Sequence, residues 1–299
     1  MAVRLSGFAD EAADSLEGQI EVTQELGWHG IEIRTVWGSN ILDLSDEQFE
    51  ELHDALESSG IRAHALGSTI ANWGRELQEP ESVALEAAER AIQRMLALGS
   101  THIRIMSWKV ISDSAGRAAD DQHEEERIRR LGTVCAMFAG AGLVPVHENC
   151  ATWGGMSWQH TRRMVDAVPH MKLVFDTGNP PLTGDYTKPW PYPDQSAREY
   201  WDHVKDHVSH VHIKDSRRNP DTGEEEYCWP GEGEGDLAYV LRDLQAMEYD
   251  GYLSIEPHMA VVFHDSSVTA PDEIRRRNYI TYGRRLESLL EELGIDFIR

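Results

Sequence analysis

The sequence alternates between short apolar runs, rich in β-branched residues, and longer segments in which apolar residues recur with a helical period. Eight apolar runs stand out, at residues 3–8, 30–34, 61–66, 102–107, 143–149, 173–177, 208–214 and 252–257. Strands that alternate with helices pair in parallel through right-handed crossovers. Eight such units predict a single-domain (β/α)₈ barrel, a TIM barrel, that spans residues 1–299.

Local signals mark where the helices between these runs begin and end. Ser45 and Gln48 have the spacing of a capping box, and Pro80 suits the first turn of the helix that follows it. Gly60 and Gly99 stand where a helix must release the chain into the next strand. These signals agree with the periodicity and support the alternation of elements.

A doubly wound open sheet is the alternative arrangement of the same elements. Its dinucleotide fingerprint, a Gly-x-Gly-x-x-Gly run after the first strand, is absent, because residues 7–11 read GFADE. A second glycine-rich run, residues 231–235 (GEGEG), alternates glycine with acids that repel a phosphate. The sequence therefore favours the barrel and predicts no nucleotide site.

Two segments that follow predicted strands are too long to be simple connections. They are residues 179–192, which are rich in proline and aromatic residues, and residues 215–235. Both lie on the side of the barrel where barrel enzymes place their active sites. We expect them to act as lids or subunit contacts.

Composition narrows the classes of function. The chain has 28 Lys and Arg against 52 Asp and Glu, a formal net charge of −24, which repels nucleic acids and anionic lipids and also suits life in high salt. Its three cysteines form no Cys-x-x-Cys pair, so we expect neither a disulfide framework nor a thiolate zinc site. No signal-peptide pattern opens the chain, and no run approaches the roughly 18 apolar residues of a membrane span. We expect a cytoplasmic protein that binds neither nucleic acid nor membranes.

Four metal-ligating residue types recur near the ends of the last four predicted strands. We call them the mouth cluster: Glu148, Asp176, His212 and Glu256. Closing the barrel aims all four side chains at its mouth. Three carboxylates cannot crowd there without a cation, because one of them would otherwise take up a proton. Taken singly, each acid could instead cap a helix or pair with a surface arginine.

The donor set indicates which ion is expected. Three carboxylates and one imidazole, without a thiolate, favour Mn²⁺ or Mg²⁺ over a structural zinc, with Co²⁺ or Zn²⁺ as possible substitutes. One divalent ion is expected, Mn²⁺ first among these.

These residues also resemble a known family, the xylose isomerase-like barrels, which include sugar phosphate isomerases and epimerases, ketose 3-epimerases, hydroxypyruvate isomerase and inosose dehydratase. The resemblance covers nearly the whole chain. The matching motifs are residues 146–149 (VHEN), 174–179 (VFDTGN), 210–215 (HVHIKD), 230–236 (PGEGEGD) and 252–258 (YLSIEPH). They are specific for the superfamily and say little about any one substrate.

The resemblance implies one Mn²⁺-like ion held by the mouth cluster, with two neighbouring oxygens of a small keto-sugar or sugar phosphate completing its coordination. It further implies that Glu148 and Glu256 act as general base and general acid on either side of the substrate. A chelated α-hydroxyketone has an acidified C–H bond, because the metal takes up the charge that develops on the enediolate oxygen. Isomerisation or epimerisation is the expected reaction. Members of the family often form homodimers or homotetramers, and residues 180–192 are the expected place of contact.

Two departures from the family pattern keep a second reaction open. Asn179 stands where ketose epimerases and the DNA-repair nucleases of the superfamily carry a histidine, and Gly154 replaces an acid of the ketose epimerases. The alternative is a dehydratase of a keto-sugar or keto-cyclitol, in which the same metal and bases expel a β-hydroxyl. Lys214 suits the leaving group of such a reaction.

Further polar residues are candidates for substrate contacts. Arg218 follows the seventh strand, where ketose epimerases place an arginine against a substrate oxygen, although Arg217 is an equal match. His258 shares a strand face with Glu256, and Asn179 and Lys214 lie beside the mouth cluster in sequence. His210 and His64 are as well explained by a place in the core. The aromatic candidates for stacking on a sugar ring are Trp37, Trp108, Trp153, Trp158 and Trp190.

Two other classes of function fit less well. A metal-dependent DNA-repair endonuclease requires a basic groove and additional histidines, against a net charge of −24 and Asn179. A catalytically silent barrel used for binding should lack a ligand, yet all four are present. The sequence therefore predicts a metal-dependent enzyme that acts on a small carbohydrate.

Overall fold

The barrel is built from eight parallel strands in the computed structural model, which describes residues 2–260 and 270–299. These strands are β1 (Val3–Gly7), β2 (Gly30–Ile33), β5 (Arg62–Gly67), β6 (His102–Ile105), β7 (Val144–Glu148), β8 (Lys172–Asp176), β9 (Val208–Ile213) and β12 (Tyr252–Ile255). They pair in the order β1-β12-β9-β8-β7-β6-β5-β2, and a parallel bridge between Phe8 and Glu32 joins the two ends. The predicted (β/α)₈ fold is confirmed, and each apolar run holds one of these strands.

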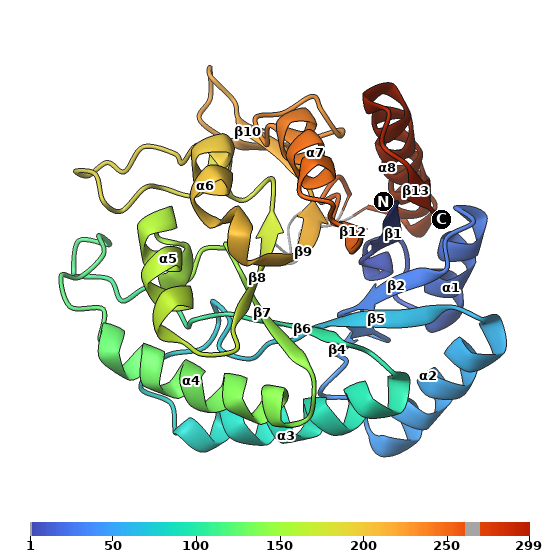
Figure 1. Ribbon diagram of the computed structural model, residues 1–299, viewed down its shortest axis with the longest axis horizontal. Coiled ribbons are helices and arrows are strands. Elements are labelled where there is room, and N and C mark those ends of the chain that lie inside the picture. The colour runs from blue at the N-terminus through green and yellow to red at the C-terminus, as the bar shows by residue number, and fades with distance from the viewer. Residues whose placement is uncertain (1, 261–269) are drawn as a thin grey trace.

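The described residues form eight α-helices. They surround the sheet (Figure 1). They are α1 (Leu16–Glu25), α2 (Asp46–Ser59), α3 (Glu81–Leu98), α4 (Glu124–Gly140), α5 (Trp158–Ala167), α6 (Ala197–Val204), α7 (Leu237–Ala246) and α8 (Asp272–Leu293). Each buries an apolar stripe; in α3, Ala88, Ala91 and Met95 are completely covered. The last strand, β13 (Phe297–Ile298), pairs with the outer edge of β1, so the two ends of the chain lie close together (Figure 1).

The helix ends follow the local sequence signals with one difference. In the capping box of α2, the Gln48 amide donates to Ser45 Oγ at 3.2 Å and the Ser45 amide donates to Gln48 Oε1 at 2.9 Å. Gly60 ends α2 in the left-handed region, at a φ of 73°. Pro80, however, caps α3 from outside rather than lying in its first turn, since its ψ of 136° is extended.

The two long segments differ in structure. Residues 215–235 contain an antiparallel hairpin formed by β10 (Asp215–Arg218) and β11 (Glu225–Cys228). Residues 179–192 open with one short helical turn, Pro180–Leu182. In the described part of the chain, no helix combines the length and apolar character that a membrane crossing requires.

The capping box gives a test of the local signals. Ser45→Ala removes the side-chain acceptor of the Gln48 amide, and we expect the free energy of unfolding to fall by about 1 kcal/mol. Urea denaturation measures the change. Glu50→Ala, at an exposed position of the same helix, is the control and should stay within about 0.5 kcal/mol of the wild type. Equal losses in the two variants would show that the cap contributes nothing particular.

Candidate active site

The barrel brings the mouth cluster together at the carboxyl ends of four adjacent strands. Glu148 and Asp176 are the last residues of β7 and β8, His212 lies one residue before the end of β9, and Glu256 follows β12 directly. One ligand atom from each of the four lies within 4.8 Å of the others. All four side chains are buried. Residues distant in sequence thus meet at a single point.

A cavity of about 260 Å³ lies over this cluster. It is lined by side chains from the strand ends and from the hairpin β10–β11: Arg34, Trp73, Arg104, Glu148, Cys150, Ala151, Asn179, Leu182, Thr183, Lys214, Glu225, Tyr227, Glu256 and His258. The cavity is large enough for a small sugar and joins an apolar wall to a strongly charged floor.

Three buried cations hold the three carboxylates of the cluster. Lys214 Nζ lies 2.9 Å from Asp176 Oδ2 and 3.2 Å from Glu256 Oε2. The Arg104 guanidinium lies 3.1 Å from Glu148 Oε2. On the other side of the cluster, Arg34 Nη1 donates to Glu256 Oε1 at 2.5 Å. Each acid therefore has at least one positive neighbour, as charge burial requires.

These cations do not compensate the three acids equally. Burial raises the pKa of Asp176 to about 7; the Lys214 ammonium opposes this effect, and the carboxylates of Glu256 and Glu148 add to it. Burial also acts to raise the pKa of Glu148, but Arg104 and His212 outweigh it and bring the pKa to about 2. One carboxylate of the cluster thus retains a proton near neutrality, which is what crowded like charges were expected to cause.

His212 is oriented by a carboxylate that the sequence analysis missed. Its Nε2 lies 3.2 Å from Glu32 Oε1, while Nδ1 faces the cluster, 3.8 Å from Glu148 Oε1. Burial favours the neutral imidazole, but Glu32 and Glu148 overcome it and raise the pKa of His212 to about 10. A carboxylate behind an imidazole in this way fixes which nitrogen is presented to a ligand.

Three buried atoms of the cluster make no hydrogen bond of acceptable geometry within the described residues: Glu148 Oε2, Asp176 Oδ2 and His212 Nδ1. The two oxygens have ion pairs, with Arg104 and Lys214, whereas the imidazole nitrogen only faces Glu148 at 3.8 Å. A buried nitrogen without a hydrogen bond is rare and suits a ligand to a cation. Two carboxylate oxygens and an imidazole nitrogen, converging with a second glutamate, fit a hard or borderline divalent ion.

Three of the candidate substrate contacts line the cavity. Asn179 donates from Nδ2 to Glu148 Oε1 at 3.1 Å, and Lys214 bridges two acids of the cluster. His258 lies at the wall, where its Nδ1 is 2.9 Å from Glu11 Oε1. All three are in a position to reach a bound molecule.

The other three candidates lie away from the cavity wall. His64 and His210 sit deeper in the barrel, the first with its Nε2 2.6 Å from Ser6 Oγ and the second with its Nε2 2.7 Å from Glu32 Oε2. Arg218 forms a forked ion pair with Asp194, with N–O distances of 2.8 and 3.0 Å. The described geometry gives these residues structural partners instead of a place beside a substrate.

The aromatic wall also differs from expectation. Of the tryptophans, Trp73 lines the cavity, whereas none of the five candidates does. Trp108 and Trp153 are buried, and Trp158 stacks on His203 with ring centroids 3.6 Å apart. Position at a strand end is therefore a poor guide to which aromatic residue reaches the mouth.

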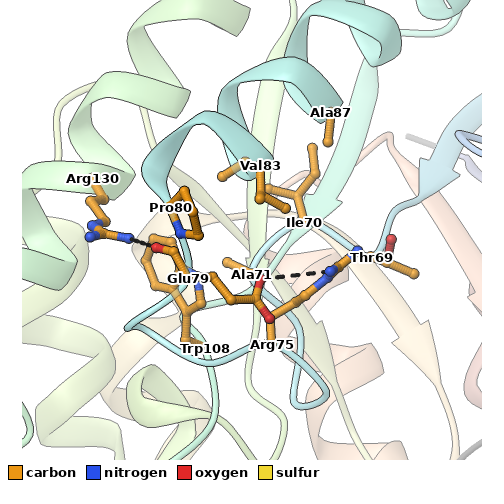
Figure 2. Close-up of a pocket in the computed structure, with 11 residues that line it drawn as sticks. Thr69, Ile70, Ala71, Arg75, Glu79, Pro80, Val83, Ala87, Trp108 and Arg130 are labelled. Atoms are coloured by element: carbon orange, nitrogen blue, oxygen red, sulfur yellow. Dashed lines mark hydrogen bonds and ion pairs between the residues drawn. The ribbon is translucent and has the colours of Figure 1, made fainter.

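A second pocket, shown in Figure 2, lies beside the start of α3. Trp108 and Pro80 contribute to its wall, and Arg130 closes one side by donating to the Glu79 carbonyl at 2.8 Å. Its volume of about 20 Å³ is enough for one water molecule. Apart from Trp108, one of the aromatic candidates, none of the residues that line it belongs to the mouth cluster or to the candidate substrate contacts. The cavity at the barrel mouth is therefore the candidate active site.

Comparison with known proteins places this geometry in a family. The family model of the xylose isomerase-like TIM barrels matches residues 20–277. No curated protein matches the chain.

Solved structures share the fold across almost the whole chain. A xylose isomerase-like TIM barrel protein from Mycobacterium smegmatis, solved in complex with magnesium, is 17% identical, with 97% of each chain covered and a TM-score of 0.68. D-allulose 3-epimerase from Methylomonas sp., in complex with D-allulose, is 17% identical, with 97% of each chain covered and a TM-score of 0.66. A probable 3-DHS dehydratase from Bacillus anthracis is 14% identical, with 96% of this chain and 99% of the dehydratase chain covered and a TM-score of 0.65. By its family model and its fold, the chain belongs to the xylose isomerase-like TIM barrel family.

Proposed function

We propose that this protein is a divalent-metal-dependent isomerase or epimerase of a small keto-sugar or sugar phosphate. The observation that carries the proposal is the mouth cluster itself, four buried residues that each offer one ligand atom within 4.8 Å of the others. Membership of a family whose solved relatives include a sugar epimerase supports the carbohydrate substrate.

The mouth cluster would hold one divalent ion, with Mn²⁺ the first candidate and Mg²⁺, Co²⁺ or Zn²⁺ as alternatives. When bound, the ion would offset the negative charge that develops on substrate oxygens as a neighbouring carbon loses its proton. His212 would present Nδ1, because Glu32 engages Nε2. The Mycobacterium smegmatis protein of the same fold was solved in complex with magnesium, which supports a metal site in this chain.

Proton transfer would fall to Glu148 and Glu256, which line the same cavity. Both have a pKa held below the ordinary range, Glu148 chiefly by Arg104 and Glu256 chiefly by Lys214, against the opposing effect of burial. Both are therefore ionised at neutral pH and able to accept a proton. The glutamate that takes the proton from one carbon becomes the acid that can return it to the neighbouring carbon, which would move a carbonyl. Inversion of a carbon centre would require the glutamate on the opposite side to be protonated before it donates.

A dehydratase is the second candidate, and Lys214 favours it. Its ammonium lies 3.2 Å from Glu256 and lines the cavity, where it could donate a proton to a departing hydroxyl. A relative of the same fold is named as a probable dehydratase. The two reactions share the metal and the bases and differ in whether water is lost.

Proton NMR of candidate keto-sugars in D₂O, after metal analysis of the purified protein, tests the proposal. Deuterium uptake without loss of water supports an isomerase or epimerase, and an unsaturated product supports a dehydratase.

We expect Glu256→Gln to lower turnover at least about 100-fold, because an amide can neither accept the proton nor ligate a metal ion well. Glu86→Gln, an exposed change on α3, should leave turnover unchanged. Full turnover after chelation, or in Glu256→Gln, would contradict the proposal.

Removal of the ion should expose the ionisation of Asp176. Its pKa of about 7 in the folded protein compares with about 3.9 in an unfolded chain. The folded state therefore binds the proton more tightly, so this contribution to stability is complete below about pH 4 and is lost as the pH rises through about 7.

Between about pH 5.5 and about pH 8, the chelated wild type should lose about 2 kcal/mol of unfolding free energy relative to Asp176→Asn. Urea denaturation at each pH measures the difference, and the exposed change Asp296→Asn is the control. Added Mn²⁺ should restore the wild type but not Asp176→Asn. Parallel stability curves for the chelated wild type and Asp176→Asn would show that Asp176 does not carry the proton.

A further inference from the structure

Two cations on the cavity wall have only proposed metal ligands as their ionic partners among the described residues. Arg104 is 97% buried, since only 3% of it is exposed, and its one recorded ion pair is with Glu148. Its Nη2 reaches the Ser68 carbonyl at 3.4 Å, and its buried Nε makes no hydrogen bond in the described structure. Among the described residues, the recorded contacts of the Arg104 guanidinium are thus one carboxylate, one carbonyl and the Phe8 ring, and the residue lines the cavity.

Lys214 is in the same position. Its ammonium is buried and pairs with Asp176 and Glu256, both of which belong to the mouth cluster. An ion bound there would compete with Lys214 for the same carboxylate oxygens.

Arg34 is different, because its charge is met by acids outside the mouth cluster. Its guanidinium forms a forked ion pair with Asp10, at 2.9 and 3.0 Å, and lies 3.5 Å from Glu11. Arg104 and Lys214 are therefore the cavity cations that would be left under-compensated when an ion is present.

A phosphate group has no ready place at the loop where barrel enzymes often bind one. That loop follows the seventh barrel strand, which is β9 here. The backbone amides of Gly231, Gly233 and Gly235 converge there, but all three donate to the Asp215 carboxylate at 2.9 Å. The protein thus fills its own anion site with a carboxylate, and a Cβ on Gly233 or Gly235 would collide with that carboxylate.

We propose that the substrate is an acidic keto-sugar whose carboxylate is bound by Arg104 and Lys214. This inference rests on the proposed function and names the substrate class for the same site. A carboxylate matches the planar fork of the guanidinium, and both Arg104 and Lys214 line the cavity. The cavity of about 260 Å³ accommodates a five- or six-carbon acid.

Calorimetric titration of the Mn²⁺-loaded protein tests the inference with three matched probes: D-fructose, D-fructuronate and D-fructose 6-phosphate. We expect D-fructuronate to bind at least about 10-fold more tightly than D-fructose. In Arg104→Met the ratio of the two affinities should fall to within about 2-fold, whatever the change in the affinity for D-fructose itself. Arg104→Lys retains the positive charge but not the two parallel N–H donors of the guanidinium, so it should keep part of the preference for D-fructuronate.

Controls separate loss of recognition from loss of structure. Metal content and the thermal melt are measured for each variant, because Arg104 also touches Glu148. If Arg104→Met does not fold, Arg104→Lys and the order in which the wild type binds the three probes still test the inference.

The remaining outcomes distinguish this inference from the proposed function. Equal affinity for all three probes, or a preference for the phosphate, overturns the acidic substrate even if D-fructose exchanges deuterium and the proposed function stands. Preferential binding of the acid without deuterium exchange into any keto compound supports the acid site and counts against the isomerase.

Discussion

Crowding of buried negative charge at the barrel mouth is the constraint on which the rest of the site depends. Glu148, Asp176 and Glu256 are each at most 3% exposed and converge on one point. Isolated carboxylates would be neutralised by protonation in such a place. Arg34, Arg104 and Lys214 keep two of the acids ionised, while the raised pKa of Asp176 shows that the compensation stops short of all three. The divalent ion that we propose would supply the remaining positive charge.

The same charges help to close the barrel. Between β1 and β2 the pairing is reduced to one bridge, from Phe8 to Glu32. Arg34, directly after β2, spans this junction by pairing with Asp10 after β1 and with Glu256 after β12. Its guanidinium also packs over the Phe8 ring, 4.3 Å from the centroid. Because a forked, buried ion pair is strong and directional, the site and the closure of the fold share one network.

The sequence was sufficient for the fold and for the mouth cluster because both depend on periodicity. Strand runs repeat along the chain, and a ligand at the end of each of four successive strands must point to the same mouth once the barrel closes. The alignment of neighbouring strands in the barrel then places these four side chains together, so the loop conformations are not needed to predict the cluster. Asn179, Lys214 and His258 followed because they are close in sequence to the ligands.

Residues that act across the barrel were harder to find. Arg34 and Arg104 were read only as parts of strand runs, although a charged residue near the carboxyl end of a barrel strand faces the same mouth as the ligands. The signal for Glu32 was a carboxylate between Ile31 and Ile33, a position that requires a buried partner. Arg218 lies on the hairpin, outside the barrel strands, so the barrel register does not place it: the structure pairs it with Asp194.

Below the mouth, the barrel gives up part of its apolar filling to hold His212. Glu32 accepts from both His210 and His212, so one buried carboxylate orders two imidazoles of β9 whose rings are nearly perpendicular. Small barrels normally fill this layer with branched aliphatic side chains, which specify packing but cannot orient a ligand. Burying Glu32, His210 and His212 costs desolvation free energy, and a fully hydrogen-bonded network orients side chains more than it stabilises the fold. This cost is therefore useful only if His212, the residue nearest the mouth, binds a ligand. The arrangement therefore couples metal affinity to folding stability. An ion bound to Nδ1 of His212 would stabilise the folded chain, and the buried Glu32 keeps that nitrogen oriented toward the ion.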